Sequence, residues 1–154
     1  MMLLRFGLLL TMILIKTING NLGLTALGRC IMSEASTGNR AEQIAMGFAC
    51  ERNANHASNK FPIASVTRLA QDIHAGRISD PTQGANRWYS PNLMPKENER
   101  FKCKSPIGSG NIDCNGGLEN VCANMKNYKP SWADKNKFIS IKDVRSCYFK
   151  FYKI

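Results

Sequence analysis

A chain of 154 residues with 21 basic and 11 acidic side chains has the size of one domain and a formal net charge of +10. This length supports one hydrophobic core but excludes two independent cores, so we look for a single active or binding site. A surface of this charge attracts polyanions, namely nucleic acid, anionic lipid or the acidic polymers of bacterial cell walls.

The first twenty residues have the pattern of a secretory signal. Arg5 supplies a positive charge, and a ten-residue, mainly apolar run from Phe6 to Ile15 precedes Lys16. Such a run is too short to cross a bilayer as a helix. We expect residues 1–20 to be a signal peptide, either cleaved near Gly20 or retained as an uncleaved anchor, and residues 21–154 to form one exported domain. A protein in that location is not expected to bind nucleic acid, and it would contact a membrane only through that anchor.

The first predicted helix runs from Leu24 to Ala35. Its apolar residues recur at three- and four-residue spacing on one face, as in an amphipathic helix. Glu34 falls at the edge of this face, where lost hydration is expected to raise the pKa of a carboxyl group. Such a glutamate is suited to donate a proton.

Two further helices are predicted before Gly76. Asn39 and Glu42 have the spacing of a capping box, which predicts a helix start after a turn at Ser36–Asn39. The apolar stripe of this second helix is Ala41, Ile44, Ala45 and Phe48. A third helix is expected after Pro62, with Ile63, Val66, Ala70 and Ile73 facing inward and Gly76 as its stop.

The remainder of the chain predicts a long loop and one strand. Gly, Pro, Asn and Ser dominate from Asp80 to about Ser131, and no periodicity is present. Six cysteines behind an export signal indicate disulfides formed in an oxidising compartment, with fifteen pairings open. Alternating residues from Cys147 to Tyr152 predict a half-buried strand. The expected fold class is therefore mainly α (α+β), with a disulfide-held loop region and a short C-terminal strand.

Two segments carry a family resemblance. GRCIMSEA from Gly28 to Ala35, and DPTQGANRWYSPNLMPKE from Asp80 to Glu97, resemble the SleB/CwlJ-type bacterial cell-wall hydrolases, a lysozyme-like group that cuts peptidoglycan. In that family a helical Glu-Ala pair supplies the catalytic acid, and a later loop carries Asp-Pro-Thr-x-Gly-Ala followed by aromatic residues. The resemblance covers most of the chain from about Leu24. It implies a lysozyme-like single domain with Glu34 as the general acid.

The resemblance also implies a groove for the glycan. Small residues would let the sugar approach the backbone, and aromatic faces would pack against sugar rings. The expected substrate-binding residues are Gln43, Asp80, Thr82, Gly84, Ala85, Arg87, Trp88 and Tyr89. Core packing is an equal alternative for Trp88 and Tyr89, and Gln43 would either orient Glu34 or lie at a polar edge. Asp80 precedes a proline and is expected mainly to shape the loop, with a catalytic role as its alternative.

The chain departs from the family pattern at two pairs of residues. Asn86-Arg87 stand where the family often has Thr-His, and Arg52-Asn53 transpose its Asn-Arg pair. We carry no function onto Arg52-Asn53. The two histidines, His56 and His74, lack cysteine or carboxylate partners at ligand spacing, so we expect neither a metal nor another cofactor.

The sequence therefore predicts a secreted or periplasmic enzyme that cuts the glycan strand of peptidoglycan by general acid catalysis. With Glu34 alone, the C6 hydroxyl of the sugar would attack, as in a lytic transglycosylase, whereas a second carboxylate would make it a muramidase. The alternatives are an N-acetylmuramoyl-L-alanine amidase and a catalytically inert wall-binding protein of the same fold.

Overall fold

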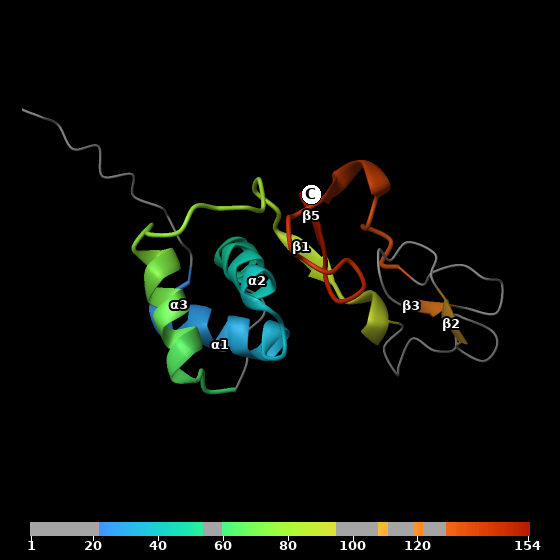
Figure 1. Cartoon of the computed structure of the whole chain (residues 1–154). Coiled ribbons are helices and arrows are strands. Elements are labelled where there is room, and N and C mark those ends of the chain that lie inside the picture. The colour runs from blue at the N-terminus through green and yellow to red at the C-terminus, as the bar shows by residue number, and fades with distance from the viewer. Residues whose placement is uncertain (1–21, 54–59, 95–107, 111–118, 122–128) are drawn as a thin grey trace, which may run out of the picture.

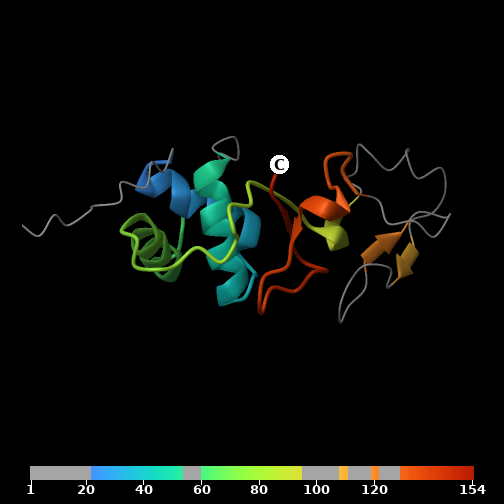
Figure 2. The ribbon, with the colours of Figure 1, turned by 90° about the horizontal axis from the view of Figure 1, so that it is seen from above.

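The protein has an α+β fold in which three helices lie at one end and a small sheet lies beside them (Figure 1). The computed structural model describes residues 22–53, 60–94, 108–110, 119–121 and 129–154. The helices are α1 (Leu24–Ala35), α2 (Arg40–Arg52) and α3 (Ala64–His74). The strands are β1 (Arg87–Tyr89), β2 (Gly108–Gly110), β3 (Glu119–Val121), β4 (Phe138–Ile139) and β5 (Lys150–Tyr152). The β2–β3 hairpin lies at the end away from the helices (Figure 2).

The three predicted helices are confirmed, two of them with the expected start or end. α1 has the predicted bounds, and the Asn39–Glu42 capping box is formed at the start of α2. Val66, Ala70 and Ile73 are buried on α3 as expected. Ile63 is a correction, because it is the residue before the first turn of α3 and is 55% exposed. Gly76 follows the end of α3 with φ of 68°, and its N–H donates a hydrogen bond to the Ile73 carbonyl.

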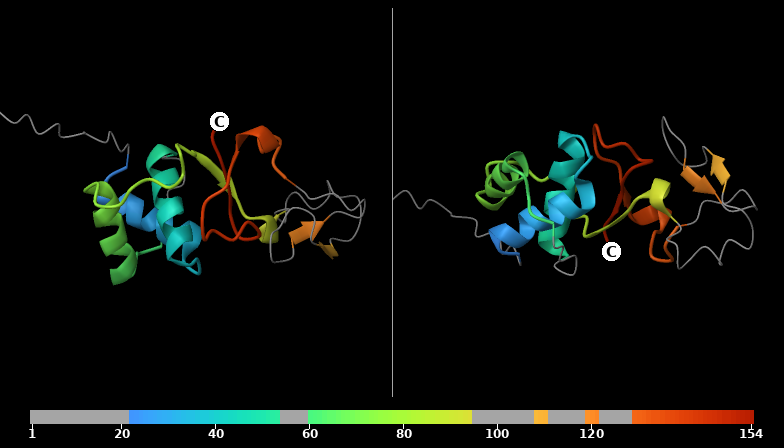
Figure 3. Two further views of the ribbon diagram at one scale, coloured as in Figure 1. Left: turned by 45° about the horizontal axis from the view of Figure 1, so that its top comes forward. Right: turned by 90° about the horizontal axis from the view of Figure 1, so that it is seen from below.

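α2 is buried more completely than its predicted stripe indicated. Ala45 and Phe48 are buried, whereas Ala41 and Ile44 are only half-buried, and every residue from Ala45 to Glu51 is buried. A Cβ on Gly47 would lie 2.4 Å from Ile73 Cδ1 and 3.2 Å from Ile31 Cδ1. The three helices lie together at one end of the molecule (Figure 3). At Gly47, the absence of a side chain lets Ile31 of α1 and Ile73 of α3 pack against α2.

The sheet joins the helical core to a second, aromatic cluster. Its strand order is β1-β5-β4, all antiparallel, with Phe151 paired to both Trp88 and Ile139. Phe151 and Trp88 belong to the core formed with the helices. Tyr152 points to the other face and packs with Tyr89. The predicted C-terminal strand exists, but it is buried on both faces rather than half-buried: Lys150 is only 5% exposed.

The predicted loop region contains short elements that the sequence did not indicate. These are β1, β2, β3 and the 3-10 turn η1 (Pro91–Leu93); a second 3-10 turn, η3 (Lys135–Lys137), precedes β4. Elements of two or three residues are too short to produce a readable alternation. Much of the expected loop, with Cys103, Cys114 and Cys122, lies outside the described residues.

Disulfides are present, as the cysteine count predicted. Cys30 of α1 is bonded to Cys50 of α2, and Cys147 is also disulfide-bonded. No described cysteine is free. Among the described residues, no helix is both long and apolar enough to cross a membrane.

Candidate functional site

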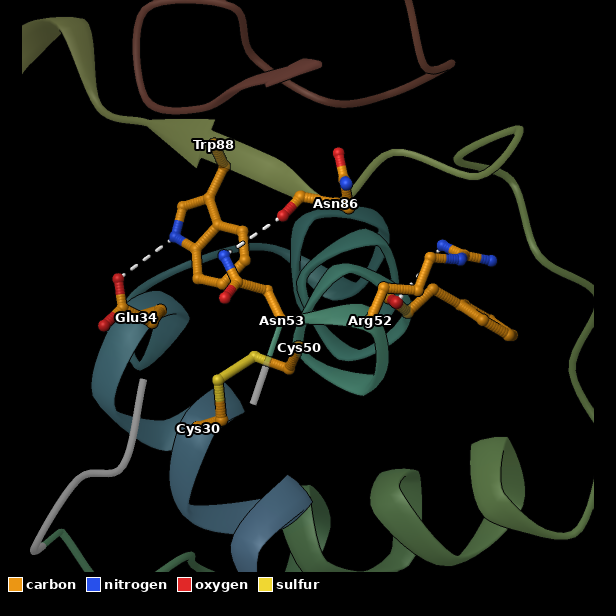
Figure 4. The surroundings of a disulfide bond; sticks show 8 residues. Cys30, Glu34, Cys50, Arg52, Asn53, Asn86 and Trp88 are labelled. Carbon is orange, nitrogen blue, oxygen red and sulfur yellow. Dashed lines mark hydrogen bonds between the residues drawn. A yellow bond between two sulfur atoms is a disulfide. The ribbon is translucent and has the colours of Figure 1, made fainter. Parts of the chain in front are cut away.

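Glu34 is held at the end of α1 by contacts from two directions. One turn earlier on the same face, Cys30 ties α1 to α2 through the disulfide with Cys50 (Figure 4). From the sheet, Trp88 Nε1 donates a hydrogen bond of 3.1 Å to Glu34 Oε2. A helix and a strand far apart in the sequence thus fix the half-buried carboxylate.

Glu34 lines a cavity of about 650 Å³, which we call the Glu34 cavity. This volume lies within the usual range for small-ligand sites. Its walls carry the aromatic residues Trp88, Tyr89, Trp132, Tyr148 and Phe149, and the polar residues Ser33, Thr37, Ser90 and Asn92. Among the described lining residues, Glu34 is the only acid and Arg87 the only base. An aromatic wall with one carboxylate suits a sugar ring and a proton transfer.

The structure brings three of the expected groove residues to Glu34. Arg87, Trp88 and Tyr89 all line the Glu34 cavity from β1. Trp88 is also buried in the helical core and Tyr89 in the aromatic cluster. Each residue therefore both packs in a hydrophobic cluster and lines the cavity. Trp132 lines the same cavity.

The Asp80 loop is built as a closed polar network. Asp80 Oδ1 accepts hydrogen bonds from the Thr82 N–H at 2.7 Å and from Thr82 Oγ1 at 2.6 Å, while its other oxygen pairs with Arg52. Arg52 Nη1 also donates to Thr82 Oγ1 at 2.8 Å and to the Ala85 carbonyl at 3.1 Å. Thr82 and Ala85 are fully buried. Their side chains are therefore not accessible to a ligand in this structure, contrary to the groove position that we expected for them.

Gly84 and Gln43 also lie outside the lining of the Glu34 cavity. Gly84 has φ of +91°, which favours glycine, and a Cβ there would lie 3.3 Å from the Lys153 side chain. Gln43 Nε2 donates to the Ala35 carbonyl at 3.3 Å. Gln43 thus steadies the C-terminal end of α1, next to Glu34.

Arg52 and Asn53, to which the sequence assigned no function, position β1. Arg52 supplies the hydrogen bonds that close the Asp80 loop, and Asn53 Nδ2 donates to the Asn86 carbonyl at 3.1 Å (Figure 4). The sequence held no signal for this role of Arg52, because its partner Asp80 lies 28 residues further along the chain. Together, Arg52 and Asn53 anchor both ends of the loop that leads to Trp88.

Two other glutamates are buried but do not line the Glu34 cavity. Burial tends to raise the pKa of Glu42, but hydrogen bonds from Arg145 and from the Asn39 N–H outweigh it and the pKa is lowered. Burial raises the pKa of Glu51, partly opposed by His74, whose Nδ1 lies 3.8 Å from Glu51 Oε1. Perturbed carboxyls often mark active sites, but these two face the protein interior.

The described residues contain no group of three or more His, Cys, Asp or Glu side chains placed to hold a metal ion. Comparisons of the chain with protein-family models, with characterised proteins and with solved structures found no match.

Proposed function

We propose that this protein is an exported, lysozyme-like enzyme that cuts the glycan strand of peptidoglycan, with Glu34 as its general acid. The observation that carries the proposal is the carboxylate of Glu34, bonded by Trp88 in the wall of an aromatic cavity whose described lining contains no other acid. The disulfide between α1 and α2 and the predicted signal peptide support export to an oxidising compartment.

The aromatic wall supplies binding, and Glu34 supplies the chemistry. Tyr89 and Trp132 would pack against the apolar faces of sugar rings, which positions the glycosidic oxygen near Glu34. The carboxyl group then transfers its proton to this oxygen as the C1–O bond breaks. Arg87, exposed at the cavity, would bind a carboxylate or an acetamido oxygen of the substrate.

The cut is best completed by the sugar itself. The carboxylate of Glu34 takes the proton of the C6 hydroxyl, whose oxygen bonds to C1 and gives a 1,6-anhydro end. This route needs one carboxylate, in agreement with Glu34 being the only acid among the described residues that line the cavity. Asp80 would have to leave its bonds with Arg52 and Thr82 to act as a second one.

Replacing Glu34 by Gln tests the proposal directly. The amide keeps the size and can still accept the Trp88 hydrogen bond, but it has no transferable proton. We expect clearance of a peptidoglycan suspension to fall about 10²–10⁴-fold. Glu51→Gln, the same change at a buried glutamate outside the cavity, is the matched control and should keep most of the activity.

Mass spectrometry of the digested wall distinguishes the candidate activities. Anhydro-muramyl ends identify a lytic transglycosylase, and reducing muramyl ends a muramidase. Released stem peptides with intact glycan would identify an amidase. Wild-type protein that sediments with peptidoglycan but releases nothing would refute catalysis and identify a wall-binding protein.

A further inference from the structure

A second cavity lies directly beside the Glu34 cavity and has an excess of basic residues, whereas the described lining of the Glu34 cavity holds one acid and one base. Its volume is about 580 Å³, and it shares Tyr89 and Phe149 with the wall of the Glu34 cavity. Its lining, within the described part of the chain, contains one acid, Asp143, and four basic residues, Lys129, Lys135, Arg145 and Lys150. We call it the lysine cavity.

The basic residues of this cavity differ in how they are paired. Arg145 is neutralised locally, because its guanidinium pairs with Glu42 at 2.7 Å. Lys129 and Lys135 are exposed and make no ion pair among the described residues. Lys150 lies on β5 and is buried, in a wall where the effective dielectric constant is below that of water. The lysine cavity therefore favours an anionic ligand.

The remaining walls indicate the size and chemistry of that ligand. Phe138, Ile139 and Ile141 provide apolar surface beside Ser140 and Ser146. A bare inorganic ion would use none of this apolar surface. A short peptide that carries carboxylates would use both the lysines and the apolar wall.

Resting on the proposed function, we infer that the lysine cavity binds the carboxylate-bearing stem peptide of the glycan that occupies the Glu34 cavity. In peptidoglycan the peptide branches from the sugar next to the scissile bond, so the two ligand parts need adjacent sites. Tyr89 and Phe149, shared by both walls, are where glycan and peptide would meet. The enzyme would then prefer peptide-bearing strands over strands stripped of peptide.

The test measures cleavage of two purified substrates, peptidoglycan glycan strands that carry stem peptides and the same strands stripped of peptide by an amidase. We expect kcat/KM to be about three- to tenfold higher on the peptide-bearing strands. Lys129→Gln with Lys135→Gln should remove this preference while leaving cleavage of stripped strands unchanged. Lys137→Gln with Lys142→Gln removes equal charge at exposed positions that line neither cavity, and should preserve the preference.

Each outcome has a definite consequence. Equal cleavage of both substrates, or a preference that survives loss of Lys129 and Lys135, would overturn the peptide site while the glycan-cutting activity stands. A preference lost equally in the control pair would also overturn it, because bulk charge would then be the cause. Failure of the wild type to cut either substrate would instead refute the proposed function and the inference with it.

Discussion

The pair formed by Glu42 and Arg145 is the contact whose loss should affect the fold most clearly. Glu42 is 0% exposed on α2, and Arg145 reaches it from the segment before β5, 103 residues later. Arg145 donates from Nε at 2.8 Å, from Nη2 at 2.7 Å and from its backbone N–H at 3.1 Å. Arg145→Met removes the two side-chain bonds and keeps the backbone bond.

The expected loss of stability follows from this geometry. Breaking a fully buried ion pair typically costs about 3–5 kcal/mol, because one charge is left without its partner. The side chain of Arg145 is 44% exposed, so solvent already screens part of the attraction. Glu42 also keeps the bond from the Asn39 N–H at 2.8 Å. We therefore expect Arg145→Met to lower the free energy of unfolding by about 2–3 kcal/mol at pH 7.

The pH dependence of this loss has a definite sign. In the wild type the pKa of Glu42 is below its ordinary value of 4.5. The stabilisation of the folded state by ionised Glu42 is therefore fully present above pH 4.5 and is lost as the pH falls through the lowered pKa. Without the guanidinium, burial dominates and raises the pKa of Glu42. The variant should then gain stability as the pH falls toward 4.5. The deficit relative to wild type is therefore largest at neutral pH and shrinks on acidification.

Urea unfolding followed by tryptophan fluorescence, at pH 7 and near pH 5, measures both quantities. Arg77→Met is the matched control, because Arg77 pairs with Asp72 at 2.8 Å on the surface and is 59% exposed. Its loss should be about 0–1 kcal/mol at either pH. A loss for Arg145→Met no greater than that of the control, or a deficit that does not decrease on acidification, would refute the stabilising role of the Glu42–Arg145 pair.

Four further outcomes are expected. Gly47→Ala should lower the free energy of unfolding by about 1–3 kcal/mol in urea titrations, because its methyl group would meet Ile73. Cys30→Ser with Cys50→Ser should cost about 2–4 kcal/mol, and Ellman titration of the denatured, unreduced wild type should find no thiol. Asp80→Asn should retain substantial wall-clearing activity with anhydro products, whereas a folded but inactive variant would identify a second catalytic carboxylate. Trp88→Phe should keep the core but lower kcat about ten- to hundredfold, because Glu34 loses the bond that orients it.

The helical part of the fold was predictable because its signals are local. The capping box at Asn39 and the spacing of apolar residues on α1 depend on neighbours within one or two turns, and both predictions were confirmed. Ile63 was assigned inward because the apolar pattern extends one residue beyond the helix start. The near-complete burial of α2 was not predictable, because it depends on how closely α1 and α3 pack around Gly47.

The site was only partly predictable, because its contacts join distant parts of the chain. Glu34 and Trp88 lie 54 residues apart and could be named from the two motifs, but their hydrogen bond could not. Thr82 and Ala85 belong to the same motif as Trp88, yet both are buried. Both accept hydrogen bonds from Arg52, which precedes them by 30 and 33 residues in the chain. A motif in the sequence therefore does not separate residues that shape a loop from residues that line a cavity.

This separation explains how Glu34 can be the single carboxylate among the described residues of an aromatic cavity wall. The polar network of Arg52, Asp80 and Thr82 is satisfied internally, so it fixes the start of β1 without adding charge to the Glu34 cavity. β1 pairs with β5, and this pairing places Trp88 where its Nε1 donates a hydrogen bond to Glu34. Because the loop and the cavity use different residues, a substitution in the loop should act through the position of Trp88, and one in the cavity should act directly on ligand binding or catalysis.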